Sequence, residues 1–170
     1  MKPRTTRRMA AALALAALLP GCATLQNVLQ PPTFRVDSGQ QAQLRLLPPA
    51  PGRPAGGAAV RLYARVGNPN AFGLTLSALA GALQLEGRNA ARVDFPLGVP
   101  LAAGQETVVP LDISVNFNDI PGLADLISRA LTGRPVSYRL HGTVGVDAGL
   151  LGQPTFGPMT LLEGDLRVSR

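Results

Sequence analysis

The stretch "VPLDISVNF", residues 109–117, decides the fold class. Apolar residues occupy its odd-numbered positions, whereas proline and polar residues occupy its even-numbered positions. Successive side chains of a β-strand point to opposite faces, so this period of two predicts a strand with one buried face and one exposed face. Pro110 has no backbone N–H to donate to a neighbouring strand, which places the predicted strand at a sheet edge or at a bulge.

The same period of two recurs along most of the chain. Further strands are predicted over residues 34–47, 60–66, 79–85, 93–97, 136–147 and 162–168. Proline and glycine lie between them, most densely over residues 48–59, which predicts exposed connecting loops. About seven short strands with turns between them predict an all-β sandwich of two sheets. Aromatic residues make up 4% of the chain, so leucine and valine must fill the core.

One segment, "NDIPGLADLISRALTGRP" at residues 118–135, has a different period. Its apolar residues fall at steps of three and four, which predicts one amphipathic helix over about 119–132. Asn118 or Asp119 suits the start of this helix, and Gly133 followed by Pro135 suits its end. Four of its apolar residues form a candidate lid for a hydrophobic ligand, with packing on the sandwich as the simpler interpretation: Leu123, Leu126, Ile127 and Leu131.

The N-terminus has the three parts of an export signal. Four basic residues precede an apolar run at residues 10–19, which is too short to span a bilayer as a helix. The following Leu19-Pro20-Gly21-Cys22 resembles the lipobox of bacterial lipoprotein precursors. This resemblance implies cleavage before Cys22 and acylation of Cys22, the single cysteine of the chain. The alternative is an ordinary signal peptide followed by an incidental cysteine.

These assignments divide the chain into a lipoprotein signal peptide (1–21), a tether (22–33) and a β-sandwich domain (34–170). The expected location is a membrane surface, reached by the general or the twin-arginine export route. Ala23, rather than aspartate, resembles the sorting pattern for the outer membrane, which implies its periplasmic face in a Gram-negative host. The expected partner is membrane lipid, contacted through acylated Cys22.

The charge of the predicted mature chain is close to neutral. The whole sequence has 16 basic and 10 acidic residues, but four of the basic residues precede Cys22 and leave 12 against 10. The remaining arginines are scattered rather than clustered, and no basic stripe with interleaved aromatic residues occurs. We therefore expect no nucleic-acid partner.

Asn68-Pro69-Asn70 interrupts the strand that begins at Val60. Pro69 lacks an N–H, so a strand ladder must end before it. An asparagine side chain can bond its own backbone two residues on, so the tripeptide predicts a turn that satisfies its own polar groups. Neither asparagine titrates, which makes a structural role the favoured interpretation over a catalytic one.

With Phe72 and three later stretches, this turn resembles a known family. The stretches are "LTLSALAGALQLEG" (74–87), "PLGVPLAAGQETVVPLDISV" (96–115) and "YRLHGTVGVD" (138–147). In this order they resemble the late embryogenesis abundant type 2 (LEA type 2) group, which shares the water stress and hypersensitive response (WHy) domain. The resemblance covers roughly residues 34–168. It implies an immunoglobulin- or fibronectin III-like sandwich and a role in tolerance of desiccation or related stress.

No motif of the sequence predicts an enzyme or a cofactor. The single histidine, His141, falls on the polar face of a predicted strand, and no nucleophile elbow, phosphate-binding loop or metal-ligand spacing occurs. Three aspartates are available for acid–base work, but a strand's outer face or a helix start explains each of them: Asp112, Asp119 and Asp125. We therefore expect no catalytic, cofactor-binding or metal-binding residues.

Two classes of function remain. The first is a membrane-tethered, non-catalytic stress-protective or interaction module that acts on client proteins or lipid surfaces. The alternative is a carrier of lipid or another hydrophobic ligand at the cell envelope, or an envelope scaffold.

Overall fold

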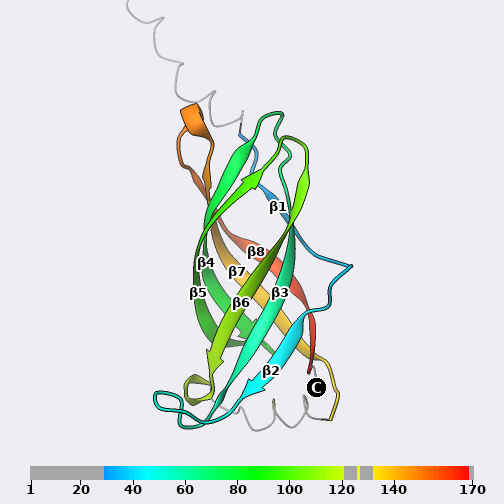
Figure 1. Ribbon diagram of the computed structural model, residues 1–170, viewed down its shortest axis with the longest axis vertical. Helices are drawn as coiled ribbons and strands as arrows, with labels where there is room; N and C mark the ends of the chain where they lie inside the picture. Colours follow the sequence, from blue (N-terminus) through cyan, green and yellow to red (C-terminus); the bar gives the residue numbers. More distant parts are fainter. Residues whose placement is uncertain (1–28, 121–125, 127–131, 169–170) are drawn as a thin grey trace, which may run out of the picture. The chain divides into compact units, whose positions relative to one another are not determined.

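The structure, a computed structural model, describes residues 29–120, 126 and 132–168 of the chain (Figure 1). Eight β-strands and two short 3₁₀ helices form the described part, in the order β1 (Thr33–Val36), β2 (Gln43–Leu47), β3 (Gly57–Gly67), β4 (Leu74–Leu85), β5 (Arg88–Leu101), β6 (Glu106–Asn116), η2 (Phe117–Asp119), β7 (Val136–Asp147), η3 (Gly149–Leu151) and β8 (Thr155–Val168).

The strands form two layers. In the first, β3 pairs along its whole length with β6 on one side, and with β1 and β2 on the other. The second has the antiparallel order β5-β4-β7-β8. Figure 1 shows β3 and β6 crossing in front of β4, β5 and β7. A short parallel pairing of β2 with the end of β8 joins the two layers. The predicted all-β sandwich is confirmed.

The edge position predicted for Pro110 is also confirmed. Pro110 lies within β6 opposite Tyr63, and β6 pairs with β3 but with no other strand of the described chain. An edge strand can hold a proline because the missing N–H faces no partner.

The prediction of a single strand over residues 34–47 is wrong. This stretch forms two strands, β1 and β2, which pair with different halves of β3. The chain leaves the β1 ladder at Asp37, whose N–H donates to the carbonyl of Tyr63 at 3.0 Å and whose side chain turns inward. A polar turn therefore separates two strands where the sequence pattern predicts one.

The core lies between the two layers and consists mainly of leucine and valine. The alternating residues of β3 and β6 point into it, as do those of β4 and β7. Its completely buried members include Leu62, Leu76, Leu83 and Leu140. Full burial of one such side chain contributes about 1.5–3 kcal/mol, so these residues supply the main driving force for folding.

The helix predicted over 119–132 lies mostly outside the described residues. Within that range, Leu126 is helical and buried, and Asp119 ends the short helix η2.

Strand register places three loops at one end of the sandwich. Thr33 at the start of β1 lies opposite Gly67, and the N–H of Asn68 donates to the carbonyl of Gln105 at 2.9 Å. Asp147 at the end of β7 lies opposite Thr75 at the start of β4. The start of β1 and the loops 68–73, 102–105 and 148–154 therefore lie together, at the top of Figure 1. We call this the β1 end.

Candidate functional site

Asn68 lies at the β1 end and joins two loops through its side chain. It is 2% exposed. Its Nδ2 donates to the carbonyl of Phe72 at 2.8 Å within its own loop. The same nitrogen lies 3.1 Å from the carbonyl of Leu101 and 3.3 Å from that of Ala102, where β5 ends. One amide thus connects the loop after β3 with the loop after β5.

Asn70 completes this arrangement. Its backbone N–H and its side-chain Nδ2 both donate to Oδ1 of Asn68, each at 3.0 Å. Its carbonyl accepts from the N–H of Gly104 at 3.2 Å. Pro69, between the two asparagines, is exposed. The polar atoms of the turn therefore bond to the protein itself, which is the geometry of a structural clamp.

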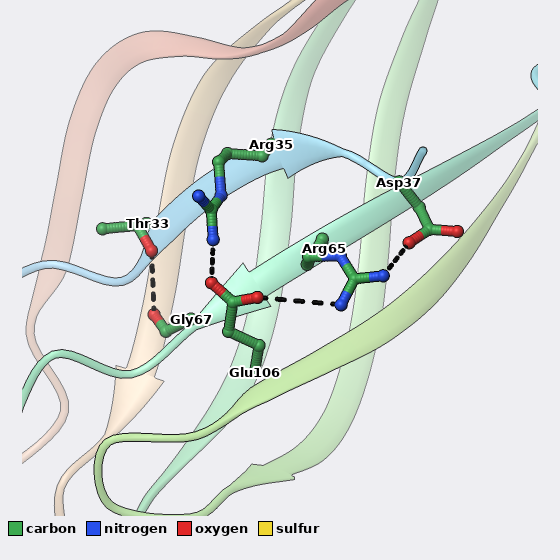
Figure 2. Close-up of polar contacts among 6 residues, drawn as sticks. All are labelled: Thr33, Arg35, Asp37, Arg65, Gly67 and Glu106. Atoms are coloured by element: carbon green, nitrogen blue, oxygen red, sulfur yellow. Dashed lines mark hydrogen bonds and ion pairs between the residues drawn. The ribbon is translucent and has the colours of Figure 1, made fainter. Parts of the chain in front are cut away.

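A chain of ion pairs lies beside this turn (Figure 2). Arg35 of β1 pairs with Glu106 at the start of β6. Nη1 of Arg65 in β3 lies 3.7 Å from Oε2 of the same glutamate, and Nη2 of Arg65 bonds to Asp37. The side chain of Asp37 is 3% exposed, whereas those of Arg65 and Glu106 are each about a third exposed. The four charges alternate in sign and tie β1 to β3 and β6.

This network of ion pairs is not predictable from the local sequence pattern. Arg35 and Arg65 are 30 positions apart and become neighbours because β1 pairs with β3 in a register that puts them opposite each other. The only sequence signal was Arg65 on the polar face of the strand predicted over residues 60–66, because Glu106 lies outside the predicted strands.

A polar hollow of about 470 Å³ is lined by residues of β4, β7 and β8 and by the turn between β4 and β5. Arg139 and Glu163 line it and form an ion pair at 3.3 Å. Tyr138, also in the lining, is 4% exposed. Burial raises the pKa of its hydroxyl, and the negative charge of Asp165 raises this pKa further. The hollow offers mainly polar groups rather than an apolar pocket for a lipid chain.

The candidate acid–base residues are not brought together. Asp112 accepts two hydrogen bonds from the Arg61 guanidinium, at 2.5 and 2.9 Å, which hold the pKa of its carboxyl below the usual value. Asp125 lies outside the described residues, and only the backbone of Asp119 is described. His141 is exposed on β7, as expected from its phase in the strand. Among the described residues, no group of three or more histidine, cysteine or acidic side chains is placed to hold a metal ion.

Several predicted site residues lie outside the described part of the chain: Cys22, Leu123, Ile127 and Leu131. Of the four candidate lid residues, only Leu126 is described, and it is 7% exposed. No helix among the described residues is long and apolar enough to cross a membrane.

Comparisons with known proteins match the chain to one family and one fold. The model of the family described as late embryogenesis abundant protein, LEA_2, matches residues 63–160. The solution structure of AT1g01470 from Arabidopsis thaliana covers 84% of this chain, with 82% of its own length aligned, a TM-score of 0.50 and 14% identity. A crystal structure of a protein from Archaeoglobus fulgidus covers 84%, with 98% of its own length aligned, a TM-score of 0.41 and 12% identity.

No curated protein gives a significant sequence match. The match to AT1g01470, at low identity, concerns the fold alone. The family match is of a different kind, because it spans more than half of the chain and includes the Asn68 turn, β4 to β7 and the first part of β8. The chain therefore belongs to the late embryogenesis abundant LEA_2 family.

Proposed function

We propose that this protein is an exported, lipid-anchored and non-catalytic module that protects client proteins or lipid surfaces when water becomes scarce. Acylated Cys22 holds it on a membrane, at the periplasmic face of the outer membrane if the host is Gram-negative. Its partners are membrane lipid, through the acyl chains, and the clients that it shields.

The observation that carries this proposal is the family match over residues 63–160. Membership of LEA_2 indicates a stress-related, non-enzymatic role. The membrane anchor is a separate inference from the lipobox-like sequence that ends at Cys22. Several buried acyl chains, at about 0.8 kcal/mol for each CH₂ group, make such an anchor stable.

The internal bonding of the fold supports a protective role. Three polar or charged residues are buried in the described chain, and each bonds to protein groups: Asp37 to Arg65, and Asn68 and Asn70 to each other. A buried polar group that bonds to protein keeps its partner when water is withdrawn. A protector has to stay folded under the condition that unfolds its clients.

The protective activity is tested with the full-length lipoprotein in vesicles. A freeze-labile oligomeric enzyme is frozen and thawed with these vesicles, with empty vesicles, or with an equal mass of serum albumin. We expect the enzyme to retain more activity with the lipoprotein than with either control. Protection no better than that of albumin would count against the proposal.

The anchor is tested separately by labelling cells with palmitate. The wild-type chain is expected to incorporate label and to fractionate with membranes, whereas the Cys22→Ala chain incorporates none. Equal labelling of both chains would rule out Cys22 as the acylated residue.

A further inference from the structure

Two exposed leucines stand at the tip of the loop between β7 and β8. Leu150 is fully exposed, and Leu151 is 39% exposed. Apart from Val36 on β1, they are the exposed large apolar residues of the described chain. Both lie in η3, within the loop 148–154, at the β1 end. Adjacent exposed leucines at a loop tip need a physical reason, because water contact with them is unfavourable.

The loop is built to hold the leucines outward. The carboxylate of Asp147 accepts from the N–H of Gly149 at 2.9 Å and from Nε2 of Gln153 at 3.1 Å. The N–H of Ala148 donates to the carbonyl of Gly152 at 2.9 Å. Gly149 and Gly152 have φ values of 61° and 86°, which side-chain-bearing residues rarely adopt. These bonds close the loop at its base and leave the leucines as its projecting part.

The loops around the leucines contain no charged residue, and the charged residues that flank them, Asp147 and Glu106, bond to protein groups. None of the residues in loops 68–73, 102–105 and 148–154 is Asp, Glu, Lys or Arg. At the opposite end, the described loops contain Arg53, Glu86 and Arg134. Burying an unpaired charge in an apolar environment is costly, so the β1 end is the one suited to contact with lipid.

The chain enters the domain at this same end. Cys22 and Thr33, the first residue of β1, are 11 positions apart. Eleven residues span at most about 40 Å when fully extended, so a lipid attached to Cys22 keeps the start of β1 within that distance of the bilayer. β4 has 12 residues. At about 3.3 Å per residue such a strand spans about 40 Å, so the domain can stand on its opposite end only if the tether is almost fully extended.

We propose that the β1 end lies against the lipid surface that carries the tether, with Leu150 and Leu151 inserted into it. The inference rests on the acyl anchor of the proposed function and adds a second, protein-borne contact. Two contacts fix the orientation of the sandwich, so that the loops that contain Arg53, Glu86 and Arg134 face away from the membrane.

The test uses the full-length lipoprotein in phosphatidylethanolamine–phosphatidylglycerol vesicles. Leu150→Cys introduces a thiol that is labelled with an environment-sensitive fluorophore, while mass spectrometry establishes whether Cys22 is acylated. The matched control is Ala55→Cys, an exposed position in the loop 48–56 at the opposite end. Vesicles with brominated acyl chains quench a fluorophore that enters the bilayer.

We expect a blue shift and quenching by brominated lipid at position 150, and neither at position 55. Acylated protein that floats with vesicles but shows no quenching at position 150 would overturn the inference and leave the anchor intact. Protein without an acyl group that fails to float would overturn both. A blue shift at position 150 without vesicles, together with a doubled mass in solution, would show that a second copy covers the leucines and would also overturn the inference.

Discussion

Asn68 is the residue on which the β3–β4 turn depends. Replacing it with alanine removes the donor to Phe72 and Leu101 and the acceptor for the N–H of Asn70. A buried group that loses its partner costs about 1–3 kcal/mol, so we expect Asn68→Ala to lower the free energy of unfolding by about 3 kcal/mol. Urea denaturation of the two proteins measures this difference.

Asn89→Ala is the matched control, because Asn89 is exposed and its side chain bonds to the half-buried Gln84. A surface change of this kind is expected to alter stability by about 0.5 kcal/mol or less. Equal effects of the two alanine substitutions would show that the Asn68 clamp does not stabilise the fold.

Tyr138 makes stability depend on alkaline pH. Burial raises the pKa of its hydroxyl in the folded protein above the usual value of 10.0. The unfolded chain therefore loses this proton at a lower pH than the folded protein does. The contribution of neutral Tyr138 to the free energy of unfolding is fully present below pH 10.0. It is lost as the pH rises through the pKa of Tyr138 in the folded protein. We expect Tyr138→Phe to flatten this loss in urea denaturations at increasing pH.

Tyr63→Phe provides the comparison, because it keeps Tyr138 and removes the other tyrosine of the chain. It should retain the alkaline loss of stability. If the free energy of unfolding of Tyr138→Phe falls with rising pH as steeply as that of the wild-type protein, other groups cause the loss.

The Asn68 clamp also shows what the sequence could reveal at this scale. The strand end before Pro69 and the bond between Asn68 and the N–H two residues on follow from local backbone rules. The bonds to Leu101 and Ala102 cross 33 and 34 positions. Such contacts depend on how β3 and β5 are placed in the fold, and no local pattern encodes that.

At the scale of elements, strand β1 is four residues long and depends on its ion pairs. Arg65→Ala would leave the carboxylate of Asp37 buried without its cation. Removing one partner of a buried ion pair lowers the free energy of unfolding by about 3–5 kcal/mol. Because Arg65 is partly exposed, we expect a smaller decrease of about 2 kcal/mol. In Arg65→Ala we expect hydrogen exchange at the β1 amides to become faster than in the wild-type protein, and to change less at the β7 amides.

Arg35→Ala is the matched control for this element. Arg35 is 65% exposed, and its partner Glu106 still faces Arg65. An exposed ion pair contributes about 0–1 kcal/mol, so protection of β1 should change little. Equal exchange of β1 in the two variants would mean that Asp37 does not hold the strand.

Strand existence was predictable from the two-residue period, but strand length was not. The strand predicted over residues 79–85 begins at Leu79, whereas β4 begins at Leu74. A register shift between Leu76 and Ala78 leaves Ser77 as an extra residue, so the buried side chains change phase there. A β-bulge of this kind breaks the alternation without ending the strand, and a periodicity argument stops at the break.

At the scale of the molecule, the family match is shorter than the folding unit. It covers residues 63–160, whereas a compact unit runs from Pro31 to Arg170. The matched segment omits β1, β2, the first half of β3 and the end of β8. The omitted parts supply Leu44, Val60, Leu62, Leu162 and Leu166 to the buried core.

We therefore expect a fragment of residues 63–160 to be unfolded and a fragment of residues 31–170 to unfold cooperatively. Without β2 and the end of β8, the pairing that joins the two layers is absent. Without the first half of β3, half of β6 also has no partner. Truncating one buried leucine costs about 2–5 kcal/mol, so losing four leucines and Val60 costs on the order of 10–20 kcal/mol, which is comparable with the whole 5–15 kcal/mol by which a typical domain is stable. Circular dichroism during urea titration distinguishes the cases, and a cooperative transition in the shorter fragment would show that the second layer folds without the first.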